Sequence, residues 1–521
     1  MIVDRFLSDS AKRTPDAIAV IELNRSISYG ELDRLANRFA NMFASHGVRR
    51  GDRVVIAGDN SIDFIAAYFG AMRAGAVSVP LPAGPRNDRF AKALADCQPV
   101  ACVVDTSLMA DPVCGQALTS VRSVFVYPHR GAWRNQAMPP GGIELGTALQ
   151  AADDAPPAVR LIDLDLAAII YTSGSTGEPR GVMLTHRNIA TNTRSIVQYL
   201  RLTAADRVMC VLPFYYVYGL SLLHTHVYAG GSLVIENRFA YPSVVLRGMR
   251  EHRVTGFAGV PSTFTLLMTR PELTGEDLSS LRYVTQAGGA MPASKISQWR
   301  ERVPHVPFYV MYGATEASAR LTYLDPSALE RKLGSIGRAI PNVDIRVFRE
   351  DGRPAETGET GELVARGSNI SCGYWNDASG TNERFSPMGY RTGDLGYVDD
   401  EGYIFLVGRR HDMIKTGAHR VGPKEIEDVI CQHPEVQEAA VVGEPHEILG
   451  EAPVAFVVPV EAAKLDTESL RAFCHQHMAS YKIPVRFVVV EQLPRIPGIG
   501  KIDRGMLRSR LAESPRTGRT A

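Results

Sequence analysis

A glycine- and hydroxyl-rich loop, "YTSGSTGEPRGVMLTHRN" (Tyr171–Asn188), lies between an apolar run and a helix-like segment. The run before it is "LAAII" and the segment after it is "NIATNTRSIVQYL". Of its first eleven residues, eight are Gly, Ser, Thr or Pro, and Arg180 adds a positive charge. A loop between a buried strand and a helix offers backbone N–H groups to an anion, and glycine lets the anion approach closely. The stretch therefore predicts a phosphate site, although a surface loop could have the same composition.

The spacing of this loop excludes the two commonest nucleotide-binding motifs. It matches neither the P-loop pattern GxxxxGK[ST] nor the dinucleotide pattern GxGxxG. The sequence also has no GxSxG element of a serine hydrolase and no HExxH zinc motif. We therefore expect phosphate chemistry that relies on neither a catalytic triad nor a zinc centre.

The composition is that of an ordinary globular protein with little overall charge. The 521 residues suffice for two or three domains, and the net charge is +1. We expect no nucleic-acid partner, because no global field draws the chain to a polyanion. The start is charged where a signal peptide would be apolar, and no apolar run is long enough to span a membrane. Seven scattered cysteines without a CxxC pair indicate reduced thiols, so the expected location is the cytoplasm.

Helix and strand patterns alternate along the chain, which predicts an α/β fold. Residues 1–409 are expected to form a large N-terminal domain of layered sheets and helices. Within it, short strands with Asp-Gly and Glu-Gly turns predict a β subdomain at about 342–408. The texture changes again after "VGRRHDMIK", which predicts a small α+β C-terminal domain at 410–521. Its last residues, "SPRTGRTA", are expected to be disordered.

Three further segments place polar side chains near glycine. "VMYGATEAS" (310–318) holds an aromatic residue that can stack on adenine and a carboxylate that can bind Mg²⁺ beside phosphates. "YRTGDLG" (390–396) places Asp394 where it can accept hydrogen bonds from two neighbouring hydroxyls, such as those of a ribose. "LPRIPGIGKIDR" (493–504) presents Lys501 on a Gly/Pro loop. Taken singly, these segments also suit a strand end, an ordinary turn aspartate and a solvated lysine.

Four motifs, in this order, resemble the core motifs of the adenylate-forming superfamily, which contains acyl-CoA synthetases, nonribosomal-peptide adenylation domains and firefly luciferase. They are "YTSGSTGEPRGVMLTH", "YGATEAS", "YRTGDLGYVDDEGYIFLVGRRHDMIKTGAHRVGPKEIE" and "GKIDR". The resemblance covers nearly the whole chain and is greatest to stand-alone acyl-CoA synthetases and acyl-carrier-protein ligases. It implies that ATP and a carboxylic acid give an acyl adenylate and pyrophosphate, and that the acyl group then passes to a thiol. The implied cofactors are ATP and Mg²⁺, with CoA, or the phosphopantetheine of a carrier protein, as acceptor.

The resemblance also implies a role for individual residues. The phosphate loop would consist of Thr172, Ser173, Gly174, Ser175, Thr176, Gly177 and Arg180, where lysine is commoner at the last position. Tyr312 and Gly313 would lie against adenine, Thr315 and Glu316 would contact phosphate and Mg²⁺, and Asp394 and Arg409 would bind the ribose. Lys501 would bridge the attacking carboxylate and the α-phosphate, although the segment before it is one residue longer than usual. The predicted catalytic residues are Lys501, Glu316 and Thr172.

The implied thiol-transfer step needs a second arrangement of the same chain. The small C-terminal domain would be mobile and would rotate at Arg409–Asp412, with His411 at the pivot. This rotation would withdraw Lys501 and bring Lys415 and Gly417 to the site, where the glycine leaves room for the pantetheine arm.

The implied acyl pocket is lined by residues 213–221, residues 285–291 and the strand "VMYG". Its predicted residues are Tyr216, Val217, Gly219, Gly288, Gly289 and Met311. The first segment, "PFYYVYGLS", lacks the aspartate by which amino-acid-activating relatives hold an ammonium, and a buried ammonium without a partner would be costly. An apolar fatty or aryl acid is therefore expected, with an open pocket floor at the two adjacent glycines. Tyr216 falls where many acyl- and aryl-CoA ligases of the family have a gating histidine. Plain core packing would also account for the tyrosines.

Several alternatives stay open at this point. The basic residues near the hinge suit the phosphates of CoA and an acidic carrier protein equally. A luciferase-like oxygenase or a non-catalytic protein could share the fold, although the intact Lys501, Glu316 and Asp394 favour an enzyme. The partners are expected to be a small acid and a thiol, in a monomer or a homodimer.

Overall fold

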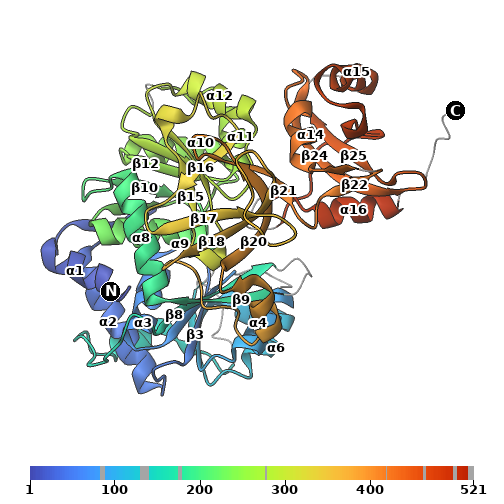
Figure 1. Ribbon diagram of the computed structural model, residues 1–521. Coiled ribbons are helices and arrows are strands. Elements are labelled where there is room, and N and C mark those ends of the chain that lie inside the picture. Colours follow the sequence, from blue (N-terminus) through green and yellow to red (C-terminus); the bar gives the residue numbers. More distant parts are fainter. Residues whose placement is uncertain are drawn as a thin grey trace.

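The computed structural model describes residues 1–82, 88–128, 140–173, 179–275, 278–417, 419–460, 465–496 and 501–513. Within these residues, three β-sheets and their covering helices build the α/β fold that the sequence predicts (Figure 1). Two sheets belong to the main body, and the third forms a smaller C-terminal part beside it (Figure 1). The tail "SPRTGRTA" lies outside the described residues.

The first sheet has seven strands and is parallel except for its last pair. Along the sheet the strands are β7 (Ile143–Glu144), β6 (Ser123–Tyr127), β5 (Ala101–Asp105), β3 (Arg53–Ala57), β4 (Val77–Leu81), β8 (Leu166–Ser173) and β9 (Pro179–Thr185). Apolar side chains project from both faces of its central strands. In β3, Val54 and Ile56 enter one hydrophobic core, and Val55 and Ala57 enter another. Strands buried on both faces read as continuous apolar runs, and this run is "VVIA".

The second sheet has fourteen strands and carries most of the predicted site. Its path runs through β17 (Val343–Phe348), β18 (Gly361–Gly367), β20 (Gly389–Val398), β21 (Ile404–Arg409), β16 (Ser335–Ala339), β15 (Thr322–Leu324), β14 (Phe308–Tyr312), β13 (Tyr283–Gln286), β12 (Gly256–Gly259), β10 (Arg207–Cys210), β11 (Ser232–Ile235), β1 (Ile18–Glu22) and β2 (Arg25–Ser28), while β19 (Phe385–Ser386) pairs with β20. The strands from β14 to β11 are parallel, whereas those from β15 to β17 pair antiparallel. The short strands of residues 342–408 therefore extend the large sheet through β16.

The third sheet has five strands and organises the C-terminal part. They are β23 (His419–Val421), β22 (Ile414–Thr416), β25 (Gly450–Pro459), β24 (Val436–His446) and β26 (Arg486–Val489), which pairs with β25 in parallel. Helices cover both of its faces: Ile426 and Leu470 pack into one core, and Leu507 and Leu511 pack into the other.

In several cases, such as α2, α3 and α8, the helices begin at a residue whose side chain caps the first turn. Their bounds are α1 (Arg5–Arg13), α2 (Tyr29–Ser45), α3 (Ile62–Arg73), α4 (Asp88–Cys97), α5 (Thr106–Ala110), α6 (Pro112–Leu118), α7 (Leu145–Gln150), α8 (His186–Leu200), α9 (Val217–Ala229), α10 (Pro242–Glu251), α11 (Pro261–Met268), α12 (Ala293–Arg302), α13 (Ala378–Arg384), α14 (Pro423–Ile430), α15 (Thr467–His477) and α16 (Arg504–Glu513), with short 3₁₀ turns at η2 (Thr315–Ala317), η3 (Pro326–Ala328) and η4 (Ser480–Lys482). At α2, the Ser28 hydroxyl accepts from the Glu31 N–H while the Glu31 carboxylate accepts from the Ser28 N–H, which is a capping box. None of the described helices combines the length and the apolar character needed to cross a bilayer.

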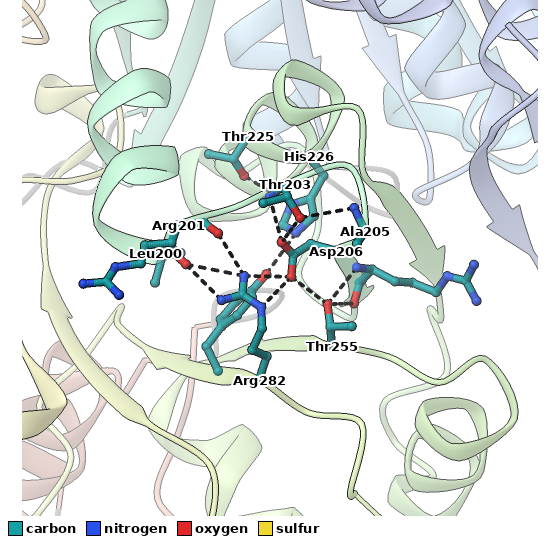
Figure 2. A network of polar contacts seen from close by, with 11 residues as sticks. Leu200, Arg201, Thr203, Ala205, Asp206, Thr225, His226, Thr255 and Arg282 are labelled. Atoms are coloured by element: carbon teal, nitrogen blue, oxygen red, sulfur yellow. Dashed lines mark hydrogen bonds and ion pairs between the residues drawn. The ribbon is translucent and has the colours of Figure 1, made fainter. Parts of the chain in front are cut away.

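A buried aspartate, Asp206, ties together the starts of three neighbouring parallel strands (Figure 2). It is 2% exposed, and its carboxylate accepts from Thr255 just before β12 and from Arg282 just before β13. The backbone N–H and hydroxyl of Thr203 donate to its other oxygen. Because Asp206 itself immediately precedes β10, this network sets the register of β10, β12 and β13, and the opposite ends of β10 and β13 lead into two of the predicted pocket segments.

Replacing Asp206 by Asn should lower the free energy of unfolding by about 2 kcal/mol, because hydrogen bonds to a buried charge are among the strongest. Urea denaturation measures this loss. Asp154→Asn is the matched control, because the ion pair of Asp154 with Arg38 is partly exposed on both sides and should contribute less than about 1 kcal/mol. Equal losses in the two variants would contradict the assigned role of Asp206.

Candidate functional site

The predicted phosphate loop joins two antiparallel strands, and the expectation of a strand followed directly by a helix is wrong. Thr172 in β8 lies opposite Arg180 in β9, and the helix α8 begins only after Thr185 caps it. The segment "PRGVMLT" becomes a strand because Val182 and Leu184, two residues apart, both enter the main core. Of the predicted loop residues, Gly174, Ser175, Thr176 and Gly177 lie outside the described residues, as does the side chain of Ser173.

Arg180 and Glu316 are connected through one tyrosine. The Tyr374 hydroxyl donates to a Glu316 carboxylate oxygen at 2.7 Å, and the Arg180 guanidinium lies over the Tyr374 ring at 5.5 Å. Arg180 also faces Asp377 at 3.4 Å. Burial raises the pKa of Tyr374, and the Glu316 carboxylate raises it further, so this hydroxyl stays a donor. The loop strand and the "YGATE" turn, which also holds Thr315, are therefore linked at one place.

The two expected adenosine contacts also meet. The Tyr312 hydroxyl, at the end of β14, donates to Asp394 in β20 at 2.5 Å. Arg409, at the end of β21, donates to the other oxygen of Asp394 at 3.2 Å, and the two residues are direct partners across the strand pair. Burial and the Asp394 carboxylate raise the pKa of Tyr312. Next to Tyr312, Gly313 is required for packing, because a Cβ there would lie 1.8 Å from the Ala319 carbonyl oxygen.

Lys501 reaches the same site from the C-terminal part. Its side chain is solvent-exposed, yet atoms of both parts crowd around it. This crowding, together with the charge of Arg409, lowers the pKa of Lys501 to about 8, while the carboxylates of Asp394 and Glu316 oppose the shift. The residue predicted from the last motif therefore lies within electrostatic reach of residues predicted from two other motifs.

The predicted hinge forms a tight turn between the two parts. The N–H groups of Asp412 and Met413 both donate to the Arg409 carbonyl, and the Arg410 N–H donates to the Gly393 carbonyl. His411 at its centre is exposed.

Lys415 lies on β22 and Gly417 directly follows that strand. Both lie away from the place where Lys501 comes within electrostatic reach of Asp394 and Glu316. The Lys415 N–H donates to Glu451, and Gly417 has a φ of +58°. The charges of Lys415 and the ion-paired Arg420 act on Glu350, just after β17. Lys501, and not the Lys415 segment, thus faces the Asp394 site in this arrangement.

The residues predicted for the acyl pocket cluster around the start of α9 and the ends of β13 and β14. Tyr216 and Val217 form the start of α9, and Met311 is buried in β14. The absent side chain of Gly219 faces the backbone of Pro213, since a Cβ there would lie 2.1 Å from its carbonyl oxygen. Cβ atoms at Gly288 and Gly289 would meet Val260 and Pro261, so both glycines lie close to the start of α11.

Sequence reasoning missed three side chains that shape this region, Arg320, Tyr374 and Asp377, and gave no role of its own to Tyr218 within the predicted segment 213–221. The Tyr218 hydroxyl donates to the carbonyl of Thr285 at 3.0 Å, and the Arg320 guanidinium lies over the Tyr218 ring at 4.7 Å. Arg320 follows the "YGATE" motif closely, which was the one available signal. Tyr374 and Asp377 are far from the motifs in sequence and meet them only because β9 pairs with the chain at Tyr374.

Comparisons with known proteins agree with this geometry. The family model "AMP-binding enzyme" matches residues 7–375, and the model "AMP-binding enzyme C-terminal domain" matches residues 425–498. The chain is 32% identical to an indoleacetate–CoA ligase of Aromatoleum aromaticum over 98% of each chain. It is 33% identical to a feruloyl-CoA synthase of an Amycolatopsis species over 96% of this chain and 97% of that one. The ATP-bound crystal structure of MatB from Rhodopseudomonas palustris superposes with a TM-score of 0.90 at 31% identity, covering 98% of this chain and 99% of MatB.

The matched family models, the full-length relatives and the shared fold lead to one assignment. The chain belongs to the AMP-binding enzyme family and is an AMP-forming ligase of the acyl-CoA synthetase type, which uses ATP and CoA.

Proposed function

We propose that this enzyme activates an aromatic carboxylic acid as its acyl adenylate at the Tyr312–Asp394–Glu316 site and then transfers the acyl group to CoA. The observation that carries the proposal is that Lys501 lies within electrostatic reach of Asp394 and Glu316, which belong to different motifs and to the other part of the chain. A lysine so placed can accompany the acid's carboxylate to the α-phosphate.

The first half-reaction needs alignment and charge neutralisation and no general base, since a carboxylate is already ionised at pH 7. Lys501 and Arg180 would supply positive charge where negative charge builds as pyrophosphate leaves. Thr172, at the base of the hairpin loop, would add a hydroxyl donor. Tyr374 binds one oxygen of Glu316, which leaves the second oxygen to ligate Mg²⁺ together with the phosphates. Among the described residues, no group of three or more His, Cys, Asp or Glu could hold a metal ion.

The nucleoside would be held by Tyr312, Gly313, Asp394 and Arg409. Asp394 offers carboxylate oxygens that vicinal ribose hydroxyls can donate to, and the hydrogen bond from Arg409 orients this carboxylate. Tyr312 would lie against adenine beside Gly313.

For the second half-reaction we propose that residues 410–521 move as a domain relative to residues 1–409. The turn at Arg409–Asp412, with the exposed His411, is a short link that can change conformation. The movement would carry Lys501 away from the site and bring Lys415 and Gly417 to it. Ion pairs such as Arg508–Asp412, at 2.7 Å, would hold the hinge to the C-terminal part during that movement.

An aromatic acid is supported by the side chains near the predicted pocket. Tyr199 stacks on Tyr323 with ring centroids 4.2 Å apart and donates to the Met311 sulfur at 3.1 Å. Aromatic and thioether groups favour a planar apolar ligand. The relatives named for indoleacetate and ferulate act on acids of this kind. None of the seven cysteines, of which six are buried, forms a disulfide, which supports a cytoplasmic location.

The direct test is ATP–pyrophosphate exchange with a panel of aryl and fatty acids, followed by thioester formation with CoA or with a phosphopantetheinylated carrier protein. We expect exchange with aryl acids and turnover with free CoA. Exchange without transfer to CoA, but with transfer to the carrier, would replace the proposed acceptor, and the absence of exchange with every acid would contradict the proposal.

Lys501→Ala should lower the rate of acyl-adenylate formation by about 10²- to 10³-fold, because a preorganised charge at the reacting phosphate is lost. The same variant should still form thioester from supplied acyl adenylate at nearly the wild-type rate. Single-turnover measurements of each half-reaction separate the two effects, and a parallel loss in both would contradict the two-arrangement account.

The pH dependence should report the lysine directly. With a pKa lowered from the ordinary 10.5 to about 8, Lys501 loses its positive charge as the pH rises through 8, so kcat/KM for adenylation should fall above that pH. Lys501→Arg keeps its charge at all accessible pH values, and its profile, at whatever absolute rate, should lack this fall. If kcat/KM for adenylation by the wild type stayed constant up to pH 9.5, this would contradict the surroundings described for Lys501.

Glu316→Gln should raise the Mg²⁺ concentration needed for half-maximal adenylation by at least about 10-fold, since one anionic ligand becomes neutral. The control is Glu330→Gln, an exposed residue paired with Arg300, which should leave the Mg²⁺ dependence unchanged. Identical Mg²⁺ titrations for Glu316→Gln and wild type would remove Glu316 from the metal site.

A further inference from the structure

Two arginines of the described chain are buried, and their surroundings differ. Arg73 is 7% exposed and faces two carboxylates, Asp33 at 2.8 Å and Asp4 at 3.8 Å. Arg320 is 3% exposed, and no carboxylate in the part of the chain that the structure describes forms an ion pair with it. Its Nε is buried without a hydrogen-bond partner.

An unpaired buried guanidinium is costly, because it cannot escape the cost by losing its proton. The surroundings of Arg320 offset this cost only in part. The face of the Tyr218 ring lies 4.7 Å from its central carbon, a cation–π contact. Burial raises the pKa of the Tyr199 and Tyr218 hydroxyls, and the positive charge of Arg320 opposes that rise, so both hydroxyls lie near the guanidinium. Neutral hydroxyls and a ring do not supply the counter-charge that Arg73 has.

Arg320 contacts Tyr218 and lies near Tyr199, and these two tyrosines bond to the other segments predicted to line the acyl pocket. Tyr218 belongs to the first segment, and its hydroxyl bonds to Thr285 in the second. Tyr199 bonds to Met311 in the third. A cation at this junction is therefore a wall residue of the pocket in which the acid's side chain would lie.

The backbone holds Arg320 in place at some strain. Ser318 and Ala319, just before it, have φ values of 57° and 121°, which are unfavourable for residues with a side chain. The side-chain amides of Asn192 and Asn369 both donate to the Arg320 carbonyl, at 2.9 and 3.0 Å. Strained backbone that is fixed by several buried bonds is typical of functional positions.

We propose that Arg320 binds a second anionic group of the acid, so that the substrate is an aromatic acid with another carboxylate at the end remote from the reacting one. This inference rests on the proposed function and narrows its substrate class. The two cations serve different ends of the molecule. Lys501 lies within reach of Asp394 and Glu316, whereas Arg320 lies among Tyr199 and Tyr218. The apolar acid expected from the sequence would leave the Arg320 charge unpaired.

The test compares matched acids that differ by one carboxylate in ATP–pyrophosphate exchange with the full-length chain. The pairs are phenylacetate and 4-carboxyphenylacetate, cinnamate and 4-carboxycinnamate, and benzoate and terephthalate. Wild type should favour the dicarboxylate in at least one pair by about 10-fold or more in kcat/KM. Arg320→Met should lose or reverse this preference and should still activate the monoacid. Arg320→Lys should keep part of the preference. A wild-type preference for the monoacid in every active pair, or an unchanged preference in Arg320→Met, would overturn the inference.

A stability measurement tests the same inference without any substrate. If Arg320 serves a ligand, Arg320→Met should leave the melting temperature of the ligand-free chain unchanged or raise it, because an uncompensated charge is removed. Arg73→Met is the matched control and should lower the melting temperature, since it leaves Asp33 and Asp4 unpaired. An equal fall for Arg320→Met would show a structural role and overturn the inference. If ATP–pyrophosphate exchange were absent with every acid, this would count against the proposed function. The comparison of the melting temperatures would still decide the role of Arg320.

Discussion

Opposed electrostatic effects meet at Lys501: desolvation and the charge of Arg409 lower its pKa, and the carboxylates of Asp394 and Glu316, which belong to the other part of the chain, oppose that shift. Asp394 lies in a strand pair and Glu316 in a short turn, so both are fixed by backbone structure. The Lys501 carbonyl accepts from the Ile496 N–H, so its backbone is held within the C-terminal part. In the proposed two-step account, movement of that part would make this cation present for one chemical step and absent for the other.

The large sheet places these fixed groups by simple means. Parallel strands end at the same edge, and the Asp206 network at their other ends keeps them in register. At the working edge, Tyr312 joins β14 to β20 through Asp394, and Tyr374 joins the "YGATE" turn to the β8–β9 hairpin through Glu316 and Arg180. Adenine, ribose, phosphate and acid can thus be bound by residues from distant segments without a dedicated binding domain.

The motif residues could be predicted from the sequence because each motif is local. Asp394 and Lys501 were found from a few neighbouring residues, and the structure brings them within electrostatic reach of each other. The hairpin after the phosphate loop was missed because "PRGVMLT" contains Pro and Gly, and its period-two burial shows only once the core is known. Arg320 could not be singled out at all. Arg320 stands out because no counter-charge among the described residues pairs with it. This can be seen only when the surrounding side chains are in place.

The meeting of Lys501 with the nucleotide site is best tested by its chemical reactivity. Lys501 would be acetylated with trace acetic anhydride over a range of pH, with and without a non-hydrolysable acyl-sulfamoyl analogue of acyl-AMP, and quantified by mass spectrometry. The account predicts that the reactivity of Lys501 titrates near pH 8 in the free enzyme and that the analogue protects it, while exposed lysines such as Lys12 react as before. Reactivity that titrates above pH 10 and is the same with and without the analogue would contradict it.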